Sequence, residues 1–190
     1  MRRALLLLAA AALAAVVVIG LTQAGGGDEP AAKGFDLAKA KQQLAGAPEP
    51  LADLHQQANE LLDGGTGAFE DRLAALRGHP VVINKWASWC GPCRAELPIL
   101  QQVSTAQGKR IAFVGVNARD KRPAAERFAA RYPVPYPSYE DEGESIARAI
   151  KAPSNFPVTL FVDEGGKTVF IHQGGYRSAA ELNADIAKYL

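Results

Sequence analysis

VVINKWASWCGPCRAELP, residues Val81–Pro98, joins an apolar run directly to a pair of cysteines. The run Val81–Trp86 is nearly continuous and rich in β-branched residues, which predicts a strand buried on both faces of a sheet. After the cysteines we expect a helix that ends at Gly108. Cys90 and Cys93, the only two cysteines of the chain, therefore stand where a buried strand gives way to a helix.

The spacing of the two cysteines favours redox chemistry. At a helix N-terminus, unpaired backbone N–H groups and the helix dipole stabilise a thiolate on Cys90. The three-residue spacing places Cys93 on the same helix face, within reach of a disulfide bond. Gly91 and Pro92 suit the sharp entry into the helix, because proline is tolerated in a first helical turn. We therefore expect one thiol to attack and the other to resolve.

Two other roles for the cysteine pair are weaker. A purely structural disulfide would close a very short loop and so remove little entropy from the unfolded chain. A zinc site would need two further ligands, and the sequence has no second cysteine pair. His55, His79 and His172 do not have paired ligand spacing. We therefore predict no metal site.

The composition fits one globular domain of ordinary size. The 190 residues are 48% hydrophobic and 22% charged, so a full core is possible without disulfide staples. The 21 basic and 20 acidic residues give a formal charge of +1 and form no long basic run. Charge therefore predicts no nucleic-acid partner.

The N-terminus predicts export. Arg2 and Arg3 precede an uncharged apolar stretch at residues 4–21, and Gly25–Gly27 follows soon after. That stretch exceeds the roughly 7 to 15 residues of a signal-peptide core and matches the ~17 to 25 that span a bilayer. We predict a signal peptide or membrane anchor at residues 1–24, favour the anchor, and place the following chain outside the cytoplasm.

The remaining elements are predicted from hydrophobic periodicity and from the glycine and proline residues that end helices and strands. Residues 25–50 are expected to be a linker that contains a short helix at Asp36–Leu44. Residues 51–67 are expected to be a helical extension, because leucines recur at helical spacing as far as Leu62. We place the main domain at residues 68–190. Its expected elements before residue 132 are a helix at 68–77, a strand at 81–86, the cysteine helix, a strand at 111–116 and a helix at 124–131.

The C-terminal part changes pattern. Prolines favour an extended backbone at residues 132–139. Asp141 with Glu144 offers an N-capping pair for a helix to about Ala149. Two short strands, 157–162 and 168–172, flank Asp163–Lys167, which predicts an antiparallel hairpin. Ser178 and Glu181 form a capping box that opens the last helix. Parallel strand-helix units followed by a hairpin predict a mixed sheet between layers of helices.

At NKWASWCGPCRAELP, residues 84–98, the sequence resembles the thioredoxin superfamily, and within it the TlpA/ResA-like extracytoplasmic thiol-disulfide oxidoreductases. The resemblance covers about residues 76–190. It implies a thioredoxin-like three-layer α/β/α sandwich with a mixed central sheet. It also implies a strand-helix insertion within residues 118–152, and that Pro157, in NFPVTLFVDEGG, is a cis-proline facing the disulfide.

The resemblance assigns roles to single residues. Cys90 and Cys93 are the expected catalytic pair, and Glu96 falls where ResA-like proteins carry a glutamate that could handle the proton of Cys93. Asn84 stands where thioredoxins carry a buried aspartate, and an amide cannot shuttle a proton. The expected substrate-binding residues are Trp89, Gly91, Pro92, Phe156, Pro157 and Gly174.

Four neighbours of the site are interpreted from the strand pattern and the resemblance. Trp86, inside the strand, is expected to belong to the core. Lys85 points to the opposite face of the strand, and we assign it no chemistry. Phe156 and Val158, which flank the proline, depart from the smaller or hydroxylated residues that are more usual in the family, so the resemblance does not assign a substrate preference.

These observations predict an extracytoplasmic oxidoreductase that reduces disulfides of exported proteins, such as apocytochrome c before haem attachment. It needs no cofactor beyond the Cys90–Cys93 disulfide. Its expected partners are exported protein thiols and a membrane or extracytoplasmic electron donor, with membrane attachment through residues 4–21 and a monomeric state. The alternatives are a disulfide-forming oxidase and a non-enzymatic metal chaperone or holdase with the same fold.

Overall fold

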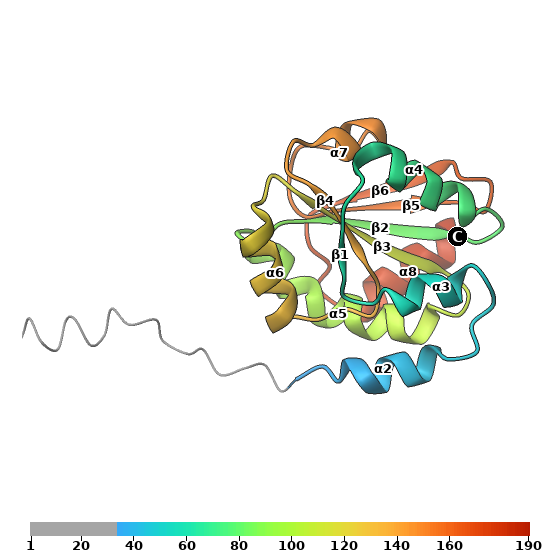
Figure 1. The fold of residues 1–190 in the computed structure, drawn as a ribbon. Coiled ribbons are helices and arrows are strands. Elements are labelled where there is room, and N and C mark those ends of the chain that lie inside the picture. The colour runs from blue at the N-terminus through green and yellow to red at the C-terminus, as the bar shows by residue number, and fades with distance from the viewer. Residues whose placement is uncertain (1–33) are drawn as a thin grey trace, which may run out of the picture. The chain divides into compact units, whose positions relative to one another are not determined.

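The computed structural model describes residues 34–190, and Phe35–Leu190 forms one compact unit (Figure 1). The predicted signal peptide or anchor at residues 1–24 lies outside the described residues, as does the first part of the predicted linker. Within residues 34–190, no helix is long and apolar enough to cross a membrane.

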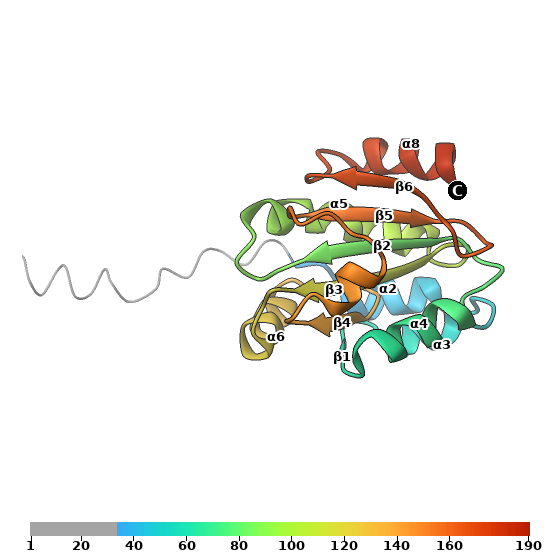
Figure 2. The ribbon, with the colours of Figure 1, turned by 90° about the horizontal axis from the view of Figure 1, so that it is seen from above.

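A six-stranded mixed sheet forms the middle layer, with the strand order β1-β4-β3-β2-β5-β6 (Figure 2). β2 pairs in parallel with β3 and antiparallel with β5, so the predicted mixed sheet is confirmed. Every residue of β2 is buried, as its apolar run predicts. The strands are β1 (Leu61–Leu62), β2 (Val81–Trp86), β3 (Ala112–Ala118), β4 (Ser138–Asp141), β5 (Val158–Val162) and β6 (Thr168–Gln173).

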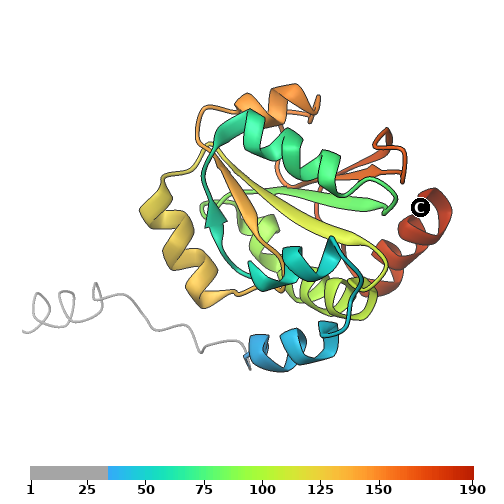
Figure 3. The same ribbon diagram turned by 45° about the vertical axis from the view of Figure 1, so that its right-hand side comes forward.

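Helices cover both faces of this sheet and complete the predicted three-layer sandwich. One hydrophobic cluster joins β2 and β3 to α3, α4 and α7, and a second joins the sheet to α5 and α8. α2 lies against α5 on the outside of that layer (Figure 3). The helices are α2 (Leu37–Leu44), α3 (Leu51–Gln56), α4 (Gly65–Ala75), α5 (Gly91–Gln107), α6 (Arg122–Arg131), α7 (Ser145–Ala149) and α8 (Ala179–Tyr189).

The helical prediction for the end of the extension is wrong. Helix α3 ends at Gln56, and Asn59 adopts a left-handed φ of 67°, which stops helical continuation. Leu61 and Leu62 then form β1, which pairs with β4 in parallel. The segment after α3 therefore contributes an edge strand to the sheet, while Leu51 and Leu54 of α3 lie in the buried core.

The predicted capping pair is misplaced, because α7 begins at Ser145 and its N-cap residue is Glu144, whose side chain makes no capping hydrogen bond. The carboxylate of Asp141, the last residue of β4, still accepts hydrogen bonds from the backbone N–H groups of Ile146 and Ala147 at 3.0 and 2.8 Å. Glu144 does not complete the capping pair. Its carboxylate instead forms an ion pair with Arg119, at 2.7 Å. The link joins the start of α7 to the loop that follows β3, next to the cysteine motif.

Candidate active site

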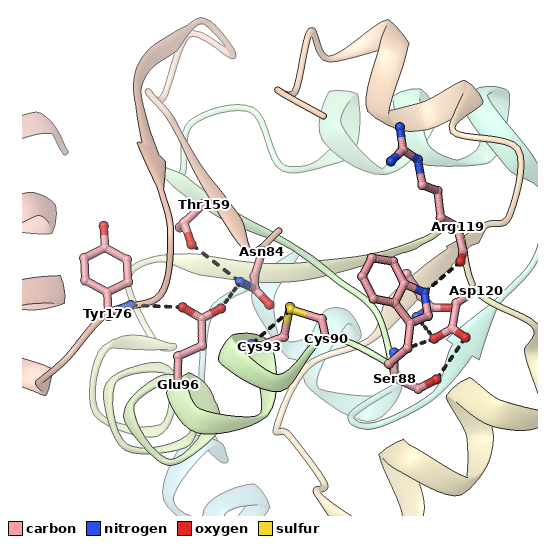
Figure 4. Close-up of a disulfide and its surroundings, with 11 residues drawn as sticks. Asn84, Ser88, Cys90, Cys93, Glu96, Arg119, Asp120, Thr159 and Tyr176 are labelled. Atoms are coloured by element: carbon pink, nitrogen blue, oxygen red, sulfur yellow. Dashed lines mark hydrogen bonds between the residues drawn. A yellow bond between two sulfur atoms is a disulfide. The ribbon is translucent and has the colours of Figure 1, made fainter. Parts of the chain in front are cut away.

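The two cysteines lie where β2 ends and α5 begins (Figure 4). Cys90 is the N-cap of α5, and its Sγ accepts a hydrogen bond from the backbone N–H of Cys93 at 3.1 Å. The two are joined by a disulfide with a Cα–Cα distance of 5.2 Å. Only 4% of Cys90 and 1% of Cys93 is exposed. The predicted position of Cys90 at a helix N-terminus, with Cys93 in disulfide reach, is confirmed.

This position has a chemical consequence for the reduced state. A thiolate on Cys90 would stand where the unpaired N–H groups of the first turn of α5 and the positive end of its dipole are concentrated. Both lower the pKa of a thiol at such a position. The arrangement therefore favours the anion of Cys90, the form that attacks a disulfide and that leaves readily when attacked.

Glu96 is a buried carboxyl group behind the disulfide, with 1% of the residue exposed. Its Oε1 accepts a hydrogen bond from Asn84 Nδ2 at 2.9 Å, and its Oε2 accepts one from the backbone N–H of Tyr176 at 3.2 Å (Figure 4). Burial raises the pKa of Glu96 from 4.5 to about 7, although both hydrogen bonds oppose the rise. Glu96 can therefore gain or lose a proton near neutral pH. It follows Cys93 by three residues, on the same face of α5.

Asn84 holds this carboxyl group in place. It is buried in β2, and its Nδ2 also lies 3.5 Å from Thr159 Oγ1 on the neighbouring strand β5. As an amide it cannot exchange a proton at these pH values. The proton chemistry that the site offers therefore belongs to Glu96 and not to β2.

Pro157 and two glycines border the same site. The Phe156–Pro157 peptide is cis, as the resemblance implies. Gly174, predicted to bind substrate, lies beside this proline, because its backbone N–H donates a hydrogen bond to the Pro157 carbonyl oxygen at 3.0 Å. Gly175 follows it: a Cβ added to Gly175 would lie 3.4 Å from the Pro92 carbonyl oxygen and 3.6 Å from Glu96 Oε2. Gly174 has a φ of 99°, and an added Cβ there would meet no atom within 4 Å. Both glycines therefore border the site, and the role of Gly174 in substrate binding stays a prediction.

An exposed aromatic surface lies next to the disulfide. Trp89 is 58% exposed, and its Nε1 donates to the backbone oxygen of Arg119 at 2.9 Å. Its ring meets that of half-buried Phe156 edge to face, with 5.0 Å between the centroids. Gly91 and Pro92 are exposed on the first turn of α5. Trp89, Phe156 and Pro92, all predicted substrate-binding residues, thus lie around one disulfide.

Asp120 fixes the loop that carries Trp89, a role that the sequence did not reveal. Its carboxylate accepts hydrogen bonds from the backbone N–H of Ser88 at 2.5 Å and from Ser88 Oγ at 2.9 Å (Figure 4). Asn117 Nδ2 donates to the same carboxylate at 3.0 Å. The sequence signal for this role was the presence of two polar residues, Asn117 and Asp120, where the apolar strand β3 ends. The end of β3 thereby holds the approach to Cys90.

The strand pattern predicts no chemistry for Lys85. Its side chain is buried, with 0% of the residue exposed, on the face of β2 opposite Asn84.

In the part of the chain that the structure describes, no cluster of three or more histidine, cysteine or acidic residues could hold a metal ion. The expectation that the protein needs no cofactor beyond its disulfide stays a prediction.

Comparison with known proteins places this geometry in context. The Redoxin family model matches residues 61–186. The thiol:disulfide interchange protein DsbE of Escherichia coli K12 is 33% identical over 143 residues, which cover 75% of this chain and 72% of that protein. The thiol-disulfide oxidoreductase ResA of Geobacillus kaustophilus is 28% identical over 106 residues, 55% of this chain, and the match spans only 60% of the ResA protein's length.

Two solved structures are similar as well. A putative thiol:disulfide interchange protein DsbE from Chlorobium tepidum has a TM-score of 0.56 and 28% identity, and covers 62% of this chain and 84% of its own. A secreted Mycobacterium tuberculosis disulfide oxidoreductase homologous to E. coli DsbE has a TM-score of 0.55 and 28% identity, and covers 60% of this chain and 85% of its own. The likeness therefore extends to solved structures of disulfide-exchange proteins.

Proposed function

This chain belongs to the redoxin family, and on that premise we propose that it is an extracytoplasmic thiol-disulfide oxidoreductase that reduces disulfides of exported proteins. One observation carries the proposal: a disulfide at the start of α5 is backed by Glu96, a buried carboxyl group whose pKa is raised to about 7. The site thus combines a redox pair with a group that can move a proton.

In the first step, the Cys90 thiolate of the reduced protein attacks one sulfur of a client disulfide. A bond forms between Cys90 Sγ and that sulfur, while the client's own S–S bond breaks and its other sulfur leaves as a thiolate. The backbone N–H of Cys93 and the dipole of α5 stabilise Cys90 before attack. The product is a mixed disulfide between Cys90 and the client.

In the second step, Cys93 resolves the mixed disulfide. Ionised Glu96 takes the proton from the Cys93 thiol, and the resulting thiolate attacks Cys90 Sγ. The Cys90–Cys93 bond forms, and the client's second sulfur leaves as a thiolate. Two electrons have passed to the client, whose two thiolates take up protons from Glu96 and from water. The protein is left oxidised, as the structure shows it.

Return to the reduced state needs two electrons from a dithiol donor, by the same exchange in reverse. We place this donor in the membrane or outside the cytoplasm, because the apolar stretch at residues 4–21 directs the chain there. The secreted mycobacterial relative supports the same location. An apocytochrome c before haem attachment is a suitable client, since its cysteines must be reduced.

Reduction is the proposed direction because a Gly-Pro pair separates the cysteines, as in reducing thioredoxins. A glutathione redox titration tests the direction. A potential near about −270 mV supports a reductase, whereas one near about −120 mV would assign the protein to the oxidants. Both values lie within the range that such a titration resolves.

Insulin reduction with dithiothreitol as the electron donor tests the activity itself. Cys90→Ala should lose all turnover, because no nucleophile remains. Cys93→Ala should instead accumulate covalent mixed disulfides with its clients. If instead the parent protein does not speed insulin reduction, and both it and Cys90→Ala keep the reduced insulin chains in solution equally well, the chain works as a holdase and not as an oxidoreductase.

A further inference from the structure

Lys85 is a charged residue in a place that suits an apolar one. It lies in the middle strand β2 and is paired with Val116 of β3 and Val158 of β5. Its side chain is among the largest that are fully buried in the described part of the chain. An ammonium group is costly to bury unless its donors and its charge are satisfied. The contacts of Lys85 therefore indicate what it is for.

Two contacts satisfy the ammonium group, and both belong to the loop that leads into Pro157. Lys85 Nζ donates a hydrogen bond to the backbone oxygen of Pro153. The same nitrogen lies 4.1 Å from the centroid of the Phe156 ring, a cation–π distance. The lysine thus holds both ends of the segment at residues 153–156, which we call the 153–156 loop.

The surroundings of Lys85 act on its charge in opposite senses. Burial lowers the pKa of Lys85, and the nearby carboxylate of Glu144 opposes this effect. Arg119, paired with Glu144, is the other cation near the Phe156 ring, at 6.0 Å. Two cations therefore lie near the Phe156 ring, and the centroid of the Trp89 ring is 5.0 Å from its centroid.

The 153–156 loop is otherwise open to solvent. Ser154 and Asn155 at its tip are exposed, while Phe156 is half-buried and Pro157 is buried beside the disulfide. A loop of this kind loses conformational freedom when a polypeptide binds to it, and that loss weakens binding. Contacts that fix the loop beforehand reduce the loss, so Lys85 has a means of acting on substrate affinity.

We propose that Lys85 is a positioning residue for polypeptide substrates. It holds the 153–156 loop so that Phe156 stays against Trp89, and the two rings form a fixed apolar surface beside the disulfide. The inference rests on the proposed function and makes it more specific: the favoured client carries an apolar side chain next to its reacting cysteine. Lys85 takes no part in electron or proton transfer, because it lies on the face of β2 opposite Asn84 and Glu96.

The test compares Lys85→Met with the parent protein on a polypeptide and on a small disulfide. Methionine keeps the volume and the apolar stem, and replacing a buried charged group with an apolar one of similar size is often neutral or stabilising. The KM for insulin should rise about fivefold to tenfold with kcat unchanged, because the lost contacts act on binding. The rate with oxidised glutathione and the redox equilibrium should stay the same.

Two further variants sharpen the result. Lys188→Met removes a surface cation–π contact to Tyr189 on α8 and should change neither substrate's kinetics. Phe156→Leu should raise the insulin KM, and Lys85→Met should raise it by a smaller factor in that background than in the parent protein, because part of the effect of the lysine acts through that ring.

An unchanged insulin KM in Lys85→Met overturns the inference, and so does a loss of rate on both substrates or a failure to fold, since each means a structural role. These outcomes are separable from failure of the proposed function. That failure would appear in the parent protein, as an absence of Cys90-dependent insulin reduction.

Discussion

Replacing Glu96 with glutamine should change how the stability of the oxidised protein depends on pH. Glutamine keeps the shape of the side chain and an oxygen that can accept the hydrogen bond from Asn84. It removes the ionisation. Between pH 4.5 and about 7, native Glu96 holds a proton that the unfolded chain has already released. The native state therefore binds more protons than the unfolded state, and stability falls as the pH rises through this window.

The size of the effect follows from the shift. A rise in pKa from 4.5 to about 7 corresponds, at about 1.36 kcal/mol per unit, to about 3 kcal/mol. That contribution is fully present below pH 4.5 and is lost once the pH exceeds the native pKa. Because the glutamine nitrogen cannot accept the hydrogen bond from the Tyr176 N–H, Glu96→Gln carries a cost that does not depend on pH. Its free energy of unfolding relative to the parent protein should nevertheless rise by about 2 to 3 kcal/mol between pH 4.5 and pH 8.

Urea unfolding of both proteins at a series of pH values from 4.5 to 8 measures this difference. Both must stay oxidised, so that the disulfide contributes equally, and their m-values must agree for the comparison to hold. Other titrating groups cancel, because only the difference between the two proteins is used. A difference that stays constant across the whole range would refute the claim that burial raises the pKa of Glu96.

Three more substitutions follow from the geometry. Asp120→Ala leaves the partly buried donors of Ser88 and the buried side-chain donor of Asn117 without their acceptor and should cost about 2 to 4 kcal/mol in urea unfolding; an unchanged midpoint would show that the loop before the cysteines does not depend on it. Gly115→Ala places a Cβ 2.0 Å from Ser138 Oγ, and this overpacking should lower the unfolding free energy by about 1 to 3 kcal/mol. Trp89→Ser should leave the melting temperature unchanged, since the ring is exposed, but should weaken insulin binding in the kinetic assay; equal KM values would remove Trp89 from the substrate surface.

The elements with strong local signals could be predicted from the sequence. Val81–Trp86 is mostly apolar and rich in β-branched residues, and the Ser178 cap stands three residues before Glu181, to whose backbone N–H it is hydrogen-bonded in the structure. Such signals need only neighbours along the chain. β1 carried no signal of this kind. Leu61 and Leu62 continue the helical spacing of the preceding leucines, and they form a strand only because they pair with β4, far away in the sequence.

The site divides in the same way. The helix N-terminus at Cys90 and the reach of Cys93 follow from spacing alone. The altered pKa of Glu96 does not, because it arises from burial and is tuned by groups 12 and 80 residues away. Lys85 shows most clearly what the sequence could not predict. Strand alternation predicted the face of β2 on which Lys85 lies, but not the loop that covers its side chain.

Successive residues of β2 serve the two halves of the proposed reaction. Asn84 points towards α5 and orients the carboxyl group that exchanges the proton. On its proposed role, Lys85 points the other way and holds the loop that receives the client. Because alternate side chains of a strand lie on opposite faces of the sheet, neither residue needs to contact the other's partners. Substitutions at the two positions should therefore separate proton transfer from client binding, although their Cα atoms are only about 3.8 Å apart.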